Sequence, residues 1–209
     1  MKRQPFRLLL RWGLITTSLS GLLFLAAGTS HVASLRAYLA LFSVWLLVTM
    51  LAVDPRLARE RVHPRNAGID DRSRFATGFL FLLTLTVAAF SVGRLRPGFN
   101  VPSPLSNAAL VAFALSSSLQ TWAMIVNPFF SPVVRLQREC GHRVIAAGPY
   151  RFMRHPGYLA MLISIPASAL AIGSFVALIP AIGFAMVIHQ PTCLATRNIP
   201  SVSPPGCLL

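Results

Sequence analysis

The segment of residues 148–158, GPYRFMRHPGY, concentrates side chains that could bind and orient a reactant. It holds two arginines, one histidine and two tyrosines, and its prolines and glycines exclude a regular element that runs through it. Arginine, histidine and the backbone N–H groups of a turn can hold a carboxylate or phosphate. A tyrosine face can receive an aromatic base or a cation. The segment could therefore form a pocket with one cationic wall and one aromatic wall.

Turn chemistry places these groups at the mouth of a helix. Gly148-Pro149 predicts a turn, and His155-Pro156-Gly157 predicts a second break before a membrane helix begins at Tyr158. Arg154, His155 and Tyr158 are then expected just below the lipid headgroups.

Composition alone also fits a simpler interpretation of the same segment. Arg151 and Arg154 would anchor the loop to lipid phosphates, and Tyr150 and Tyr158 would belong to an interfacial aromatic belt. The two interpretations differ in whether the cations face a bound reactant or only the bilayer.

The elements that must position this segment are membrane helices. The chain has 209 residues, of which 55% are hydrophobic and 11% charged, and its mean hydropathy is +0.64. A soluble domain carries about 25% charged residues. Apolar runs of the length that crosses a bilayer predict an all-α polytopic membrane protein. The four predicted transmembrane helices are 8–28, 35–53, 75–93 and 105–126.

The last apolar region, 158–188, is longer than one crossing requires. Pro166, Gly173-Ser174 and Pro180 interrupt it, and proline inside a helix removes a hydrogen bond and kinks it. We predict a C-terminal hairpin of two short helices with its break near Gly173. A single kinked span is the alternative.

Arginine and lysine counts predict the orientation in the membrane. The N-terminal tail and the loops 54–74 and 127–157 together carry fourteen of these cations, and the two opposite loops carry three. Cytoplasmic loops are the positively charged ones, so the N-terminus and both long loops are expected in the cytoplasm. In a bacterium this membrane would be the inner membrane.

The same distribution explains the net charge of +14 without nucleic acid, because the cations lie between the apolar runs and form no basic face. The loop 54–74 fits a juxtamembrane helix on the headgroups. Cys140, Cys193 and Cys207 have no metal-ligand spacing, so no metal site is predicted. The expected partners are therefore the bilayer and a lipophilic small molecule, and the oligomeric state stays open.

The order of residues before and within the 148–158 segment closely resembles the isoprenylcysteine carboxyl methyltransferase family and its bacterial relatives. That group is related to the phospholipid N-methyltransferases. The family pattern is a helix ending in Gln-x-Glu, then Gly-His-x-Val, Gly-x-Tyr and Arg-His-Pro-x-Tyr. These elements occur here in order, at 137–139, 141–144, 148–150 and 154–158. The resemblance is strong over 127–165 and weaker over 35–126, where DPRLARERVHP is similar to a family loop.

The resemblance implies S-adenosylmethionine as cofactor and methyl transfer to a lipophilic acceptor. Arg154, His155 and Tyr158 are the residues that it implies for catalysis. The implied cofactor contacts are Gln137, His142, Arg143, Val144, Ile145, Tyr150, His155, Pro156, Gly157 and Tyr158. The side-chain types fit, because Arg154 and His155 could hold the carboxylate of the cofactor and Val144, Ile145 and Tyr150 could line a slot for its adenine.

The acceptor decides what else the site needs. A carboxylate, as on an isoprenylcysteine-like molecule, is already ionised, and catalysis is then mostly alignment of the two reactants. An amine, as on a phospholipid headgroup, must lose a proton, and His155 or Glu139 could accept it. The carboxylate is the expected acceptor and the amine the alternative.

The C-terminal part of the chain departs from the family pattern. Family members continue into a cytoplasmic helix with an arginine and an acidic pair, whereas this chain has no Asp or Glu after Glu139. From about His189 the sequence changes abruptly, as a truncation or frameshift would make it. We therefore expect a methyltransferase-like domain over 1–190 and a disordered tail over 191–209. A non-catalytic membrane protein that has lost half of the site is the third possibility.

Overall fold

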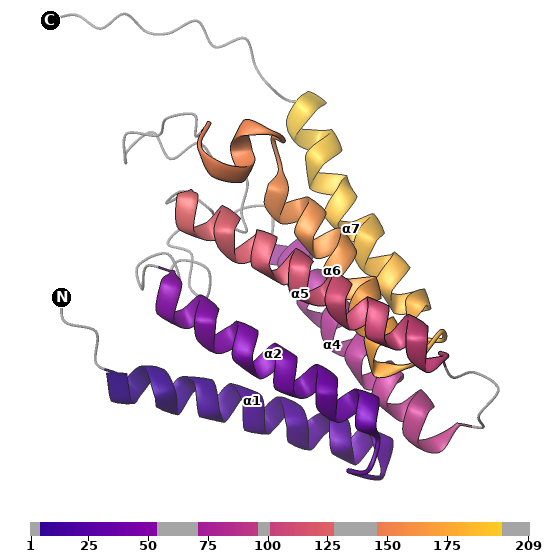
Figure 1. Cartoon of the computed structure of the whole chain (residues 1–209). Coiled ribbons are helices and arrows are strands. Elements are labelled where there is room, and N and C mark those ends of the chain that lie inside the picture. Colours follow the sequence, from indigo (N-terminus) through magenta and orange to yellow (C-terminus); the bar gives the residue numbers. More distant parts are fainter. Residues whose placement is uncertain (1–4, 54–70, 96–100, 128–145, 198–209) are drawn as a thin grey trace, which may run out of the picture.

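The computed structural model describes residues 5–53, 71–95, 101–127 and 146–197, and these ranges are helical almost throughout. The helices are α1 (Pro5–Ala27), α2 (Ala33–Ala52), α4 (Asp71–Arg94), α5 (Ser103–Val126), the 3-10 turn η3 (Gly148–Arg151), α6 (Pro156–Ile172) and α7 (Leu178–Arg197), as Figure 1 shows. The prediction of an all-α fold is confirmed.

Four of these helices are long and apolar enough to cross a membrane, so the chain is an integral membrane protein. They are Phe6–Ala27, Ala33–Ala52, Phe75–Arg94 and Ser103–Val126. The predicted bounds differ from α1, α2, α4 and α5 by at most four residues. The largest difference is at the start of α4, because its first turn is the polar run DRSR, which an apolar pattern does not include.

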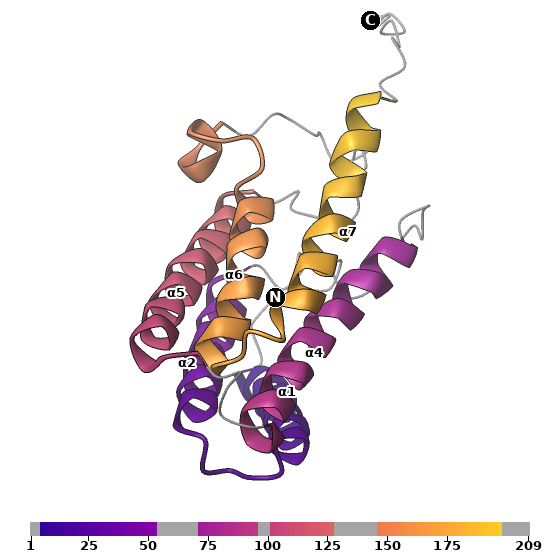
Figure 2. The ribbon, with the colours of Figure 1, turned by 90° about the vertical axis from the view of Figure 1, so that its right-hand side faces the viewer.

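Consecutive helices alternate in direction, so the bundle has two ends. The start of α6 and the finish of α5 lie at one end, which we call the site end. The turn between α6 and α7 lies at the opposite end. Helix α6 packs against α5, α4, α7 and α2, and α4 also packs against α1 and α7 (Figures 1 and 2).

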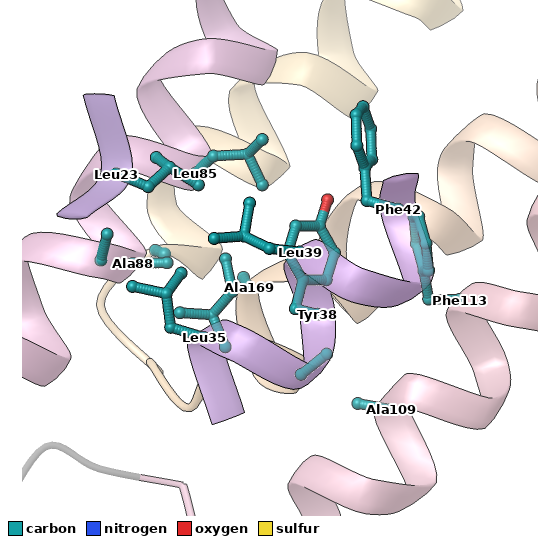
Figure 3. Close-up of a cluster of buried hydrophobic side chains, with 14 of the residues drawn as sticks. Leu23, Leu35, Tyr38, Leu39, Phe42, Leu85, Ala88, Ala109, Phe113 and Ala169 are labelled. Carbon is teal, nitrogen blue, oxygen red and sulfur yellow. The ribbon is translucent and has the colours of Figure 1, made fainter. Parts of the chain in front are cut away.

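The largest core cluster joins α1, α2, α4, α5 and α6 (Figure 3). Aromatic rings of α2 and α5 meet at its centre, where the ring centroids of Tyr38 and Phe113 are 5.1 Å apart. Small residues such as Ala88 and Ala169 are fully buried beside them and let the helices approach closely. This cluster thus anchors the C-terminal part of α6, from Ala167 to Ile172.

The predicted hairpin is confirmed, and its break is at Gly173. This residue has φ +113°, which only glycine adopts readily, and the N–H groups of Gly173 and Ser174 both donate to the Ala169 carbonyl. Pro166 and Pro180 interrupt neither helix. Pro180 is the third residue of α7, where a helix has no carbonyl to pair with its missing N–H.

Three other segments satisfy the carbonyl groups at the end of α6. The bonds run from Ser106 Oγ to the Ala171 carbonyl (2.8 Å), from Ser34 Oγ to the Ile172 carbonyl (2.5 Å) and from the Val101 N–H to the Gly173 carbonyl (2.8 Å). Ser91 Oγ also donates to Ser174 Oγ over 2.7 Å. Because lipid offers no partners to such groups, these bonds fix the hairpin turn to α2, α4 and α5.

Helix α7 continues through Arg197, so residues 191–197 of the predicted tail are helical. Residues 198–209 lie outside the described residues, as do residues 54–70 of the loop that fits a juxtamembrane helix. Residues 71–74 of that loop form the first turn of α4.

Candidate active site

The site begins with the turn η3, which packs on the last turn of α5 (Figure 1). Gly148 has φ +58°, and a Cβ atom there would come within 2.9 Å of Val126 Cγ2 and 3.2 Å of Trp122 Nε1. Pro149 is buried in the same contact. The turn predicted at Gly148-Pro149 is therefore present, and glycine is required for both its conformation and its close approach to α5.

A side-chain hydrogen bond joins η3 to the end of α5. Asn127 Nδ2 donates to the Tyr150 hydroxyl over 3.1 Å, and both side chains are half-buried. Burial raises the pKa of Tyr150, and the bond from Asn127 opposes that shift in part. The phenol is therefore neutral at physiological pH and its ring has a defined position.

Helix α6 begins at Pro156, two residues before the predicted start at Tyr158. His155 is its N-cap residue, with φ −132° and ψ 60°, and the His155 carbonyl accepts the N–H of Leu159 over 3.2 Å. Proline is favoured at the first helical position because its fixed φ is helical and its missing N–H costs nothing there. The predicted break at His155-Pro156-Gly157 is thus the helix start itself.

His155 and Tyr158 form a stacked ring pair at this helix start. Their ring centroids are 5.6 Å apart and the ring planes differ by 27°. Residues three apart share one face of a helix, which explains the pair. Tyr158 is half-buried and packs against the cluster formed by Ile165, Ala181, Phe184 and Ile188 of α6 and α7, whereas His155 is exposed. The half-buried tyrosine ring therefore supports the exposed imidazole.

Arg151 and Arg154 are exposed on either side of Phe152 and Met153. Their exposed guanidinium groups can bind an anion at the site end.

Of the predicted site residues, Tyr150 lies in η3, Pro156, Gly157 and Tyr158 lie in the first turn of α6, and Arg154 and His155 lie between these elements. The structure brings the rings of His155 and Tyr158 into contact. Gln137, His142, Arg143, Val144 and Ile145 lie outside the described residues. The sequence pattern did not single out Asn127, and its bond to Tyr150 was not predicted. An asparagine that ends a helix next to a proline gives no signal of a partner 23 residues later.

A cavity of about 360 Å³ lies at the opposite end of the bundle, near the hairpin turn. Its lining includes Ser34, Ser106 and Gly173. The two serine hydroxyls there already donate to carbonyl groups of α6. This cavity is separated from η3 by the length of α6 and takes no part in the candidate site.

Residues 108–190 match the model of the isoprenylcysteine carboxyl methyltransferase (ICMT) family. This part of the chain, 83 of its 209 residues, is similar to that family. It contains most of α5, all of η3 and α6, and the first part of α7. It therefore includes both partners of the Asn127–Tyr150 bond and both rings of the His155–Tyr158 pair. No curated protein and no solved structure matches the chain.

The match confirms the resemblance seen in the sequence over residues 108–190, and the four apolar helices make the chain a membrane protein. Methyltransferases of this family generally use S-adenosylmethionine.

Proposed function

We propose that this protein is an S-adenosylmethionine-dependent methyltransferase that acts on a lipophilic acceptor at the site end of the bundle. The stacked pair of His155 and Tyr158 at the start of α6 is the observation that supports this most directly. It places an exposed polar ring beside Arg154 at a membrane-helix start, within the ICMT-family region.

The described side chains fit such a cofactor. Its carboxylate requires cationic or N–H donors, and Arg154 and His155 are exposed where the first turn of α6 directs its N–H groups out of the helix. Its adenine and sulfonium groups favour aromatic neighbours, and Tyr150 and Tyr158 are the half-buried aromatic groups of this segment. When bound, the cofactor would supply an electrophilic methyl group.

The remaining contacts in this proposal come from the preceding loop. Gln137 and the run His142, Arg143, Val144 and Ile145 would complete the cofactor site, with the two apolar residues against the adenine. Pro156 and Gly157 would contribute by setting the start of α6, where both are buried.

The acceptor in this proposal is the carboxylate of an isoprenylcysteine-like molecule. A carboxylate needs no general base, so the chain has to orient the acceptor and exclude water at the site end. An amine acceptor such as a phospholipid headgroup would need to lose a proton. His155, exposed at the helix start, would accept it.

We place the site end, and with it the N-terminus, on the cytoplasmic side. In the sequence, fourteen of the lysines and arginines lie in the N-terminal tail and the loops 54–74 and 127–157, against three in the other two loops. In a bacterial cell the membrane would be the inner membrane.

Binding of S-adenosylmethionine to the purified chain in detergent tests the proposal first, and helical circular dichroism establishes that the chain is folded. Transfer of a labelled methyl group to a prenylated cysteine and to phosphatidylethanolamine then separates carboxylate from amine acceptors. Folded protein that binds no cofactor would overturn the proposal. That result would favour a non-catalytic membrane protein, which the lack of any Asp or Glu after Glu139 also favours.

A further inference from the structure

The site end carries an exposed aromatic ring between two cations. Phe152 follows η3 directly and is 77% exposed, among the highest values for a large apolar side chain in the described residues. Arg151 precedes it and Arg154 follows two residues later, and both are exposed. A ring so exposed gains nothing from the packing of the bundle.

The position of this ring relative to the membrane helices explains its exposure. Phe152 follows η3, which packs on α5, a helix long and apolar enough to cross the membrane, and it precedes the first turn of α6. Trp122, whose indole Nε1 lies beside Gly148, is 47% exposed on α5 at the same end. Aromatic rings at this level lie in the headgroup layer, where their apolar faces leave water.

The charges indicate which lipid this surface meets. Arg151 and Arg154 are both exposed, and the whole chain carries a net charge of +14. A guanidinium pairs well with a phosphodiester, and a headgroup without a compensating ammonium leaves that attraction undiminished.

We propose that Trp122, Arg151 and Phe152 form a headgroup patch that binds anionic phospholipid of the surrounding bilayer. The Phe152 ring inserts at the boundary of headgroups and acyl chains, and the Arg151 guanidinium pairs with a phosphate beside it. The patch binds lipid whether or not the neighbouring site transfers methyl groups.

A tryptophan reporter tests the patch in the full-length protein. Phe152→Trp is reconstituted in vesicles in which either phosphatidylglycerol or phosphatidylcholine carries bromine on its acyl chain, at equal total composition. The signal of the parent chain, with its three native tryptophans, is subtracted. We expect quenching by brominated phosphatidylglycerol to exceed that by brominated phosphatidylcholine by up to roughly fivefold, from about 1 kcal/mol for the one arginine, Arg151, near the membrane surface.

Matched variants assign the preference to the patch. Arg151→Gln should bring the two quenching values close to each other, and Arg151→Lys should keep them apart. Arg36 is exposed near the start of α2, at the opposite end of the bundle. Arg36→Gln makes the same charge change there and should leave the preference for phosphatidylglycerol unaltered. Phe175→Trp, in the hairpin turn, should show less preference for phosphatidylglycerol than Phe152→Trp.

Two results would overturn the headgroup patch. One is equal quenching by both lipids in the parent background, and the other is a preference that Arg151→Gln leaves unchanged in folded protein. Because the readout involves no cofactor, neither result bears on the methyltransferase proposal.

Discussion

Asn127 at the end of α5 donates a hydrogen bond of 3.1 Å to the hydroxyl of Tyr150 in η3. Asn127 precedes the segment 128–145 and Tyr150 follows it, and this segment contains five of the predicted cofactor contacts. The bond therefore joins a residue on each side of the segment. Gly148 reinforces the same junction, because its lack of a side chain lets η3 approach Trp122 and Val126. The bracketing residues of the candidate cofactor loop are therefore held at a fixed separation.

Replacing either partner of this bond should weaken cofactor binding. We expect Asn127→Ala and Tyr150→Phe each to lower the free energy of unfolding by about 1 kcal/mol and to raise the Kd for S-adenosylmethionine several-fold. The double variant should be only slightly less stable, and bind only slightly more weakly, than the poorer single variant, because both substitutions remove the same hydrogen bond. Calorimetric titration and thermal unfolding in the same detergent measure both quantities. Asn107→Ala is the control, because Asn107 is exposed near the start of α5 at the opposite end of the bundle. Strictly additive effects of Asn127→Ala and Tyr150→Phe would contradict the coupling.

The Tyr150 phenol should titrate above the usual tyrosine pKa of about 10. Burial is the main cause and favours the neutral phenol. Because the pKa is raised in the folded state, this group stabilises the fold fully below the unfolded pKa, and the contribution is lost as pH rises through the folded pKa. The difference in 295-nm absorbance between the parent chain and Tyr150→Phe gives the midpoint. A midpoint at or below 10 would show that the ring is solvated.

The transmembrane helices could be predicted from the sequence because each one depends only on a local apolar run. The hairpin could be predicted because Gly173 lies in the middle of an apolar run that is longer than one membrane crossing requires. The contacts that fix these elements could not be predicted. Ser34 and Ile172 are 138 residues apart, and a serine near a helix start gives no sign of such a distant carbonyl partner. Within the site, the Arg-His-Pro-x-Tyr pattern indicated His155 and Tyr158, but the role of Asn127 depended on packing between η3 and α5.

Gly173→Ala should destabilise the hairpin through its backbone conformation. An added Cβ would meet its nearest atoms at 3.5 Å and 3.6 Å, which is ordinary contact, so the φ of +113° is the cause. We expect a loss of about 1–3 kcal/mol in the free energy of unfolding. Gly78→Ala is the matched control, because that helical glycine has open space around its Cβ position, and it should be neutral or slightly stabilising. Equal thermal midpoints for the two variants would refute the strained turn.

Substitutions at His155 and Tyr158 separate ring stacking from hydrogen bonding in cofactor binding. His155→Phe keeps an aromatic ring over Tyr158 but removes the N–H donor, whereas His155→Ala removes both. A ring pair contributes about 0.5–1.5 kcal/mol, so loss of stacking alone should raise the Kd for S-adenosylmethionine roughly two- to tenfold. If the imidazole binds the carboxylate of the cofactor, both variants should bind it equally weakly. If it only supports Tyr158, His155→Phe should bind as the parent does.

Tyr158→Phe completes this comparison, because it keeps the ring packed against the cluster of Ile165, Ala181, Phe184 and Ile188 and removes only the hydroxyl. Tyr158→Ala would instead open a space beside that cluster and should lower the thermal midpoint as well as cofactor affinity. Affinity is measured by titration and folding by circular dichroism on the same samples. Unchanged affinity in His155→Ala and Tyr158→Ala, with both chains folded, would remove this ring pair from the cofactor site and leave it a purely structural feature of the start of α6.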